Sequence, residues 1–397
     1  MKFLVENIFN IDCASSYDLS SERNHPYFTC GFKQYYFKGD ENMKFDVVVG
    51  NPPYQENDNG KRDDGAANAS ASPLYHHFFD LARKISNEKI NLIFPARWLT
   101  GAGKGLDNFS KRMLNDTHIK SISIYKDSCK IFPNTEIKGG VMYLIYDKYY
   151  DGKAQVNFLD SDGELSKYTG YLNSAESGVF IPYGALVSIF QKIRAKENLT
   201  TNSIQTIVSG RKPFGLTTDF FKNPMKYDFP PVHSSREDAT DIEIIGLENS
   251  KRITKYVSKN YPITVGLNLI KKWKVFAPYA YGSGKFGEVG PNLIVGHPGQ
   301  ISTETFLAIG PFDTEFEANA FVKYFKTKFF RALVGILKIT QHSTTTYRFV
   351  PKLDFTKSNK EIDWLASVDK IDKQLAKKYG LNKEEFKLIN TKVKTMN

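Results

Sequence analysis

The segment from Lys44 to Gln55, KFDVVVGNPPYQ, contains the residues whose types and spacing are best suited to chemistry. Asn51 offers a side-chain amide and Tyr54 an aromatic face, and two prolines separate them. The preceding valine run is typical of a strand that is covered on both faces, and the prolines end this strand because they cannot donate to a sheet ladder. Ligands of open α/β sheets bind at the carboxyl ends of strands, so we expect a rigid ligand-binding loop here.

The elements that position this loop follow an α/β pattern up to about residue 150. Strands are predicted over 45–50, 90–94, 119–125 and 139–146, with helical spacing over 73–86 (Leu74, Phe78, Leu81 and Ile85) and over 105–116 (Leu106, Phe109 and Met113). This alternation predicts a largely parallel sheet with right-handed crossovers. Shorter strands and a helix near 185–194 follow, which places a domain boundary near Asp151 and gives domains of 1–150 and 151–397.

Composition limits the class of protein. The chain has 397 residues, 41% of them hydrophobic, which is enough for a sizeable core. The three cysteines lack metal-ligand spacing, and the adjacent His76 and His77 point about 100° apart on a helix, so we expect no metal site. Neither a signal peptide nor a membrane-spanning segment is evident, which predicts a cytoplasmic protein without a membrane partner.

A net charge of +11 favours a polyanionic partner. Two stretches, 251–287 and 318–353, contain no acidic residue, and aromatic or hydroxyl side chains lie among their basic residues. We expect double-stranded DNA to contact Lys271, Lys272 and Lys274 in the first stretch and Arg348 in the second, since basic side chains bind phosphates. The alternative is that both stretches are ordinary solvated faces.

With its N-P-P-Y motif, the chain resembles the adenine-specific DNA methyltransferases of type II restriction-modification systems, in the TaqI-like group. The segments SPLYHHFFDLARK, INLIFPARWLTGAGKGLDNFSKRMLND and CKIFPNTEIKGGVMYLIYD look like those that follow the motif in this family, in the same order. The resemblance implies methyl transfer from S-adenosylmethionine to the exocyclic amino group of a flipped adenine. Asn51, Pro52, Pro53 and Tyr54 would form the catalytic loop, and Tyr54 and Phe132 would stack on the base. The alternatives are a structural turn at Asn51 and core packing of Phe132.

The resemblance leaves the cofactor site incomplete. The family carries a glycine-rich loop and an acidic ribose-binding residue well upstream of N-P-P-Y, and the fifty residues before Asn51 contain no such loop. Asp12 would match an acidic residue near the cofactor, or it is a surface aspartate. A permuted loop at Gly282 and Gly284 is disfavoured, because the glycine- and proline-rich sequence after it cannot form the helix that such a loop feeds.

The resemblance therefore implies an amino-terminally incomplete, Rossmann-like methyltransferase sheet, followed by a mixed α/β target-recognition domain with a helical carboxyl-terminal tail. Another polypeptide would then supply the missing cofactor-binding segment, and a cognate restriction endonuclease is a further candidate partner. The competing interpretation is a catalytically silent module that binds DNA or confers specificity, or a fragment of such an enzyme.

Overall fold

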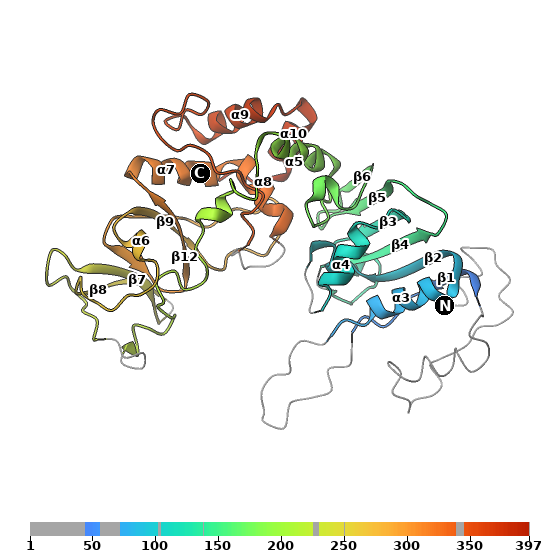
Figure 1. Cartoon of the computed structure of the whole chain (residues 1–397), viewed down its shortest axis with the longest axis horizontal. Helices are drawn as coiled ribbons and strands as arrows, with labels where there is room; N and C mark the ends of the chain where they lie inside the picture. Colours follow the sequence, from blue (N-terminus) through green and yellow to red (C-terminus); the bar gives the residue numbers. More distant parts are fainter. Residues whose placement is uncertain are drawn as a thin grey trace, which may run out of the picture. The chain divides into compact units, whose positions relative to one another are not determined.

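The computed structural model describes residues 44–55, 72–101, 105–137, 139–224, 230–249, 251–338 and 345–396. The chain forms two compact units, Met1–Gly184 and Ala185–Asn397, each of which is described by itself (Figure 1). The boundary lies after the expected position near Asp151. The reason is that two strands beyond Asp151 pair with the sheet of the first unit rather than beginning a new domain.

Strands and short helices alternate through the first unit. Its elements are β1 (Phe45–Gly50), α3 (Tyr75–Ile85), β2 (Ser86–Pro95), η1 (Ala96–Thr100), α4 (Asp107–Leu114), β3 (Ile119–Tyr125), η2 (Ser128–Lys130), β4 (Val141–Asp147), β5 (Ala154–Leu159), β6 (Leu165–Gly170) and η3 (Ser174–Glu176). The predicted strands 45–50 and 119–125 are confirmed with their bounds.

These strands form one mixed sheet in the order β1-β2-β4-β3-β5-β6. Parallel pairing joins β1 to β2 and β3 to β5, whereas β2–β4, β3–β4 and β5–β6 are antiparallel. The expectation of a largely parallel sheet was therefore wrong. The described residues between β3 and β4 form a single short 3-10 turn, so the chain reverses there and β4 runs back between β2 and β3. As a result, β1, β2, β3 and β5 point in one direction, and their carboxyl ends meet at one edge of the sheet.

The strand β1 lies at an edge of this sheet. It pairs with β2, and no second strand pairs with it among the residues that the structure describes. Val48 and Val49 are partly buried and Val47 is 37% exposed, so the expected coverage on both faces is not found. Within the described ranges, this edge with its exposed Val47 leaves backbone groups and an apolar side chain available to another segment.

Helices α3 and α4 pack against the sheet through aromatic residues. Phe109 and Met113 of α4 are buried as the spacing predicted. In α3 the buried residues are Tyr75, Phe79 and Ala82, so the buried face is rotated by one residue from the predicted face at Phe78, Leu81 and Ile85. The large aromatic residues before the helix midpoint determine which face turns inward, because they remove the most apolar surface from water.

The second unit contains two small sheets and a group of helices. Its elements are α5 (Gly184–Lys196), η4 (Ile204–Ile207), β7 (Ile242–Glu248), β8 (Lys251–Val257), α6 (Leu267–Ile270), β9 (Trp273–Pro278), β10 (Ile294–Gly296), β11 (Gln300–Ser302), β12 (Phe306–Phe312), α7 (Glu315–Lys326), α8 (Lys328–Leu337), α9 (Val368–Tyr379) and α10 (Lys383–Lys392). The sheets have the orders β10-β9-β12 and β11-β7-β8.

A shared hydrophobic core joins the two small sheets. It includes Ile244 of β7, Phe276 of β9 and Ala308 of β12, all of which are fully buried.

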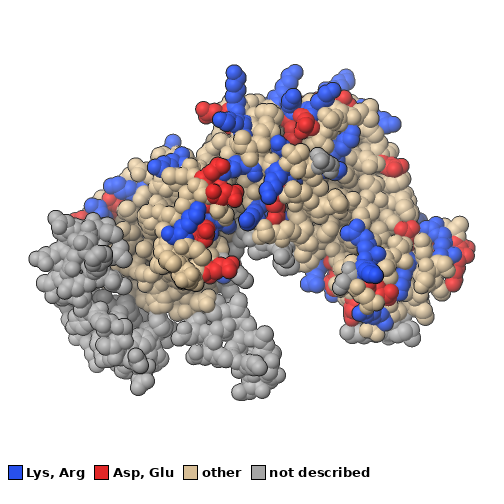
Figure 2. Space-filling view, turned by 180° about the vertical axis from the view of Figure 1, so that it is seen from behind, with Lys and Arg blue, Asp and Glu red and all other residues tan. Residues whose placement is uncertain are grey.

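The face seen in Figure 2 carries basic side chains that are interspersed with acidic ones, without a continuous basic surface over the described residues. Within the part of the chain that the structure describes, no helix is long and apolar enough to span a membrane.

Candidate active site

The Asn51–Tyr54 loop directly follows β1 and is fixed at its far end. The Leu74 N–H donates to the Tyr54 carbonyl oxygen over 3.1 Å, and Gln55 forms an antiparallel bridge with Pro73. Asn51 is exposed, whereas Pro52 is buried and Tyr54 is partly buried. The two prolines restrict the backbone between these anchors, so the side-chain amide of Asn51 is presented from a rigid loop.

The hydroxyl of Tyr54 lies beside the Asn51 side chain. Burial raises the pKa of Tyr54 to about 12, and the Asn51 side chain lowers it in part. The buried hydroxyl has no hydrogen-bond partner of ordinary geometry within the described residues. The phenol is therefore neutral at physiological pH. An uncharged aromatic ring next to an exposed amide suits the recognition of a flat, neutral heterocycle.

Phe132 lies at the same edge of the sheet as Asn51. It belongs to the connection after β3, where its N–H donates to the Ser128 carbonyl oxygen over 2.8 Å and its carbonyl accepts from the Thr135 N–H over 3.1 Å. The ring is partly buried. Three strand spacings separate β1 from β3, or about 14 Å, so this loop must bend toward β1 for Phe132 to face Tyr54 across a base.

Two residues at this edge were not identified from the sequence as candidate site residues. Tyr75 begins α3 and stacks on Phe94 with ring centroids 5.2 Å apart, and Arg97 follows β2 with an exposed side chain. The signal that could have revealed Arg97 was its place three residues after the end of the predicted strand 90–94, near a strand's carboxyl end like Asn51.

Nothing in the described part of the chain supports a cofactor-binding role for Asp12 or for the glycine-rich stretch at Gly282 and Gly284. Asp12 lies outside the described residues. The N–H groups of Ser283 and Gly284, in the glycine-rich stretch, donate to the Glu288 carboxylate over 2.7 and 3.2 Å. Lys338 also donates to Glu288, over 2.5 Å. An internal anion therefore occupies the amides that a permuted cofactor loop would need, in agreement with the sequence argument against it.

The prediction that Lys274 contacts DNA was wrong. Its side chain is fully buried, and its ammonium donates to the carbonyl oxygens of Ile270, His297 and Gln300 over 3.2, 3.0 and 2.9 Å. Burial lowers the pKa of this lysine to about 7, and the three acceptors oppose that effect because they stabilise the ammonium form. A buried cation that holds three carbonyls cannot bind a phosphate.

The other predicted DNA contacts lie on the surface of the second unit. Lys271 and Lys272 are exposed, and Lys272 pairs with Asp313 over 2.7 Å. Arg348 is exposed and lies over the Phe349 ring at 4.9 Å. These positions are compatible with phosphate contacts, and the assignment of Lys271, Lys272 and Arg348 to DNA stays a prediction.

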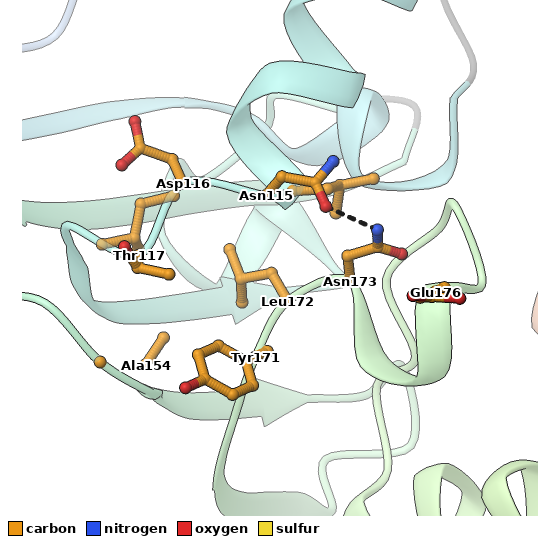
Figure 3. A pocket seen from close by; sticks show the side chains of 11 residues that line it. Asn115, Asp116, Thr117, Ala154, Tyr171, Leu172, Asn173 and Glu176 are labelled. Atoms are coloured by element: carbon orange, nitrogen blue, oxygen red, sulfur yellow. Dashed lines mark hydrogen bonds between the residues drawn. The ribbon is translucent and has the colours of Figure 1, made fainter.

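A pocket of about 240 Å³ lies at the opposite edge of the first sheet, at the amino ends of β3 and β5 (Figure 3). Asn173 donates to the Asn115 side-chain oxygen there over 2.7 Å. Asp116 lines the pocket and already pairs with Arg83 and His118. This pocket is therefore separate from the edge that carries Asn51.

The fold and the site define a class of structure: a mixed α/β unit that carries a rigid Asn-Pro-Pro-Tyr loop at the carboxyl edge of its sheet. Within the chain, residues 4–132 match the family model described as Eco57I restriction-modification methylase. This range includes both Asn51 and Phe132.

A relative from Mycoplasma pneumoniae (strain ATCC 29342 / M129 / Subtype 1), described as an uncharacterized adenine-specific methylase, is 37% identical over 115 residues. The match covers 29% of this chain and 26% of the relative, so the chain spans about a quarter of the curated relative that it matches.

Among solved structures, the type IIL restriction-modification enzyme MmeI in complex with DNA is 10% identical with a TM-score of 0.42, over 87% of this chain and 57% of that one. The type IIG restriction endonuclease BpuSI is 11% identical with a TM-score of 0.34, over 88% of this chain and 54% of that one. Likenesses of this size do not establish a shared fold.

Proposed function

We propose that this chain forms the catalytic and target-recognition parts of an adenine-specific DNA methyltransferase of a restriction-modification system, in the TaqI-like group. One observation carries the proposal. The Asn51–Tyr54 loop stands at the carboxyl end of a strand that has a parallel neighbour, with Asn51 exposed, inside the segment that matches a restriction-modification methylase family. The second unit, with its exposed Lys271, Lys272 and Arg348, would bind duplex DNA, and a cognate endonuclease would complete the system.

The geometry of the loop suits the methylation of an amino group. The exocyclic nitrogen of adenine is a poor nucleophile because its lone pair is delocalised into the ring. The Asn51 side-chain oxygen and the backbone carbonyl of Pro52 would accept its two hydrogens and favour a tetrahedral nitrogen, whose lone pair can then attack. The prolines fix the acceptors in advance, and Tyr54 and Phe132 would stack on the flipped base.

Methyltransferases of this kind use S-adenosylmethionine, which supplies the methyl group as a sulfonium. The described residues fit the base-binding side of such a site better than the cofactor side. The glycine-rich amides at Ser283 and Gly284 are taken by Glu288, and β1 has an unpaired edge within the described residues. We therefore propose that the cofactor site is completed by another polypeptide that covers the edge of β1.

The catalytic proposal is tested with Asn51→Ala. Loss of one transition-state hydrogen-bond acceptor typically costs about 3 to 4 kcal/mol, or roughly two to three decades in rate. We expect methyl transfer to DNA to fall by that factor in whichever assembly is active, while DNA affinity stays nearly unchanged. Asn87→Ala is the matched control, because Asn87 is exposed on the same sheet near the amino end of β2. Wild-type rates from Asn51→Ala would refute the assignment.

The second candidate is a catalytically silent module that binds DNA, which the occupied amides at Glu288 favour. Calorimetry with S-adenosylmethionine separates the two candidates. We expect weak or no binding by the 397-residue chain alone, and micromolar binding once the completing segment is added. Micromolar binding by the chain alone would contradict the incomplete cofactor site, and an absence of binding in every assembly would favour the silent module.

A further inference from the structure

Arg97 is held firmly at the catalytic edge of the first sheet. It lies in η1, directly after β2 and thus beside the end of β1. The Ala96 N–H donates to the Gly140 carbonyl oxygen over 3.0 Å, and the Thr100 hydroxyl donates to the Arg97 carbonyl oxygen over 2.9 Å. The following residue, Trp98, is fully buried. The backbone of Arg97 is therefore fixed, while its side chain reaches solvent.

The arginine stem packs over Gly139, in the connection that contains Phe132. Gly139 has a φ of +93°, and a Cβ atom added there would lie 2.6 Å from the Arg97 Cγ. Only a glycine both tolerates this backbone conformation and leaves space for the stem. The position of Arg97 is thus tied to the loop that would provide one aromatic wall of the base site.

The charge of Arg97 acts on the other side of the same site. Burial raises the pKa of the Tyr75 hydroxyl, and the nearby guanidinium lowers it in part. Tyr75 begins α3 directly after Leu74, whose N–H binds the Tyr54 carbonyl. Arg97 therefore lies between the segment that carries Tyr54 and the loop that carries Phe132.

Within the described ranges, the Arg97 guanidinium has no ion pair and no side-chain hydrogen bond. Other arginines of the first unit are paired: Arg83 with Asp116 over 3.4 Å, and Arg112 with Asp80. An exposed, unpaired guanidinium on a fixed stem is suited to bidentate binding of a phosphate.

We propose that Arg97 binds a DNA backbone phosphate next to the flipped base. Flipping rotates a nucleotide about its own backbone, so the flanking phosphates are the anions nearest to a base that enters beside Asn51. This inference rests on the proposed function, because it assumes that the target base enters at this edge.

The experiment compares Arg97→Gln with Arg97→Lys, Gly139→Ala and the charge-matched control Arg112→Gln, all in the full 397-residue chain. Binding to a fluorescent DNA duplex is measured by anisotropy between about 50 and 300 mM NaCl, because counterion release makes the affinity fall steeply with salt over such a range. Loss of one phosphate contact should lower the log–log salt slope by about 0.9. We expect this drop for Arg97→Gln and Gly139→Ala, and no drop for Arg97→Lys or Arg112→Gln.

Equal slopes for wild type, Arg97→Gln and Arg112→Gln would overturn the inference, as would a drop for Arg97→Lys equal to that for Arg97→Gln. The proposed function has a separate readout, namely methyl transfer by the wild type and by Asn51→Ala. If methyl transfer depends on Asn51 while the slopes are equal, only the Arg97 inference fails. If the Arg97→Gln slope drops but no assembly transfers methyl groups, only the catalytic proposal fails.

Discussion

The replacement of Lys274 by methionine gives the sharpest test of the second unit, because structure and sequence predict opposite outcomes. Lys274 lies near the start of β9, and its ammonium donates to three carbonyl oxygens. These belong to Ile270 at the end of α6, His297 in the turn before β11 and Gln300 at the start of β11. Methionine has a similar length without a donor. The substitution would leave the three carbonyl oxygens without this donor beside a fully buried side chain.

The magnitude follows from the number of acceptors. Each lost hydrogen bond to a carbonyl costs about 1 kcal/mol, so three give about 3 kcal/mol. The apolar methionine and the removal of the buried charge offset part of this cost. Two of the carbonyls also keep a second donor: Ile270 accepts from the Gly299 N–H over 2.7 Å, and His297 accepts from the Gln300 N–H over 3.1 Å. We expect the free energy of unfolding of the second unit to fall by about 2 to 3 kcal/mol.

Urea unfolding measures this change, with hydrogen exchange of β9 and β11 amides to assign the transition to the second unit. Lys271→Met is the control, since Lys271 is exposed and should change stability by less than about 0.5 kcal/mol. The salt slope of DNA binding should be the same for folded Lys274→Met and wild type. An unchanged stability together with a slope lowered by about 0.9 would refute the structural role and restore the phosphate contact.

Two further predictions concern Glu288 and the aromatic walls. Burial alone would raise the pKa of Glu288, but Lys338 and two backbone N–H groups outweigh it and hold the pKa below its ordinary value of 4.5. The ionised Glu288 carboxylate therefore stabilises the folded state fully above about pH 4.5, and this stabilisation is lost as the pH falls below that value. In Glu288→Gln, the free energy of unfolding measured in urea should fall less steeply as the pH drops below about 4.5. The same pH dependence as in the wild type would contradict this. With 2-aminopurine at the target position, fluorescence should rise on binding, and Tyr54→Ala or Phe132→Ala should change that rise, unlike the control Tyr149→Ala at a residue 78% exposed. No rise at a verified target site would count against base flipping.

The strands of the first unit could be predicted because their signals are local. The β-branched run before Asn51 and the alternation over β3 both depend on residues within one strand, and each is confirmed with its bounds. Strand pairing is not local. The β1–α3–β2 segment is parallel, as the alternation predicts, but β4 inserts between β2 and β3, and nothing in its own sequence distinguishes it from a parallel strand.

The same distinction explains which site residues could be predicted. Asn51 and Tyr54 lie three residues apart on one rigid loop, so their relation follows from the chain itself. The surroundings of Arg97 are formed by Gly139 and Tyr75, which belong to other segments.

The basic stretches were misleading because a sequence without acidic residues still folds against acceptors from elsewhere in the chain. Lys274 donates to three carbonyl oxygens, and Lys338 donates to Glu288, fifty positions away. Lys323 donates to the carbonyl oxygens of Trp364, Leu365 and Ala366 over 2.8 to 3.1 Å. Backbone carbonyls accept from an ammonium as readily as from any neutral donor, and composition does not count them. A lysine run therefore predicts a DNA surface only for those members whose ammonium groups remain unpaired after folding. Exposed Lys271, for which the described part of the chain provides no ion pair, is one of them. The search for phosphate contacts should accordingly begin from unpaired cations at the edge that carries Asn51.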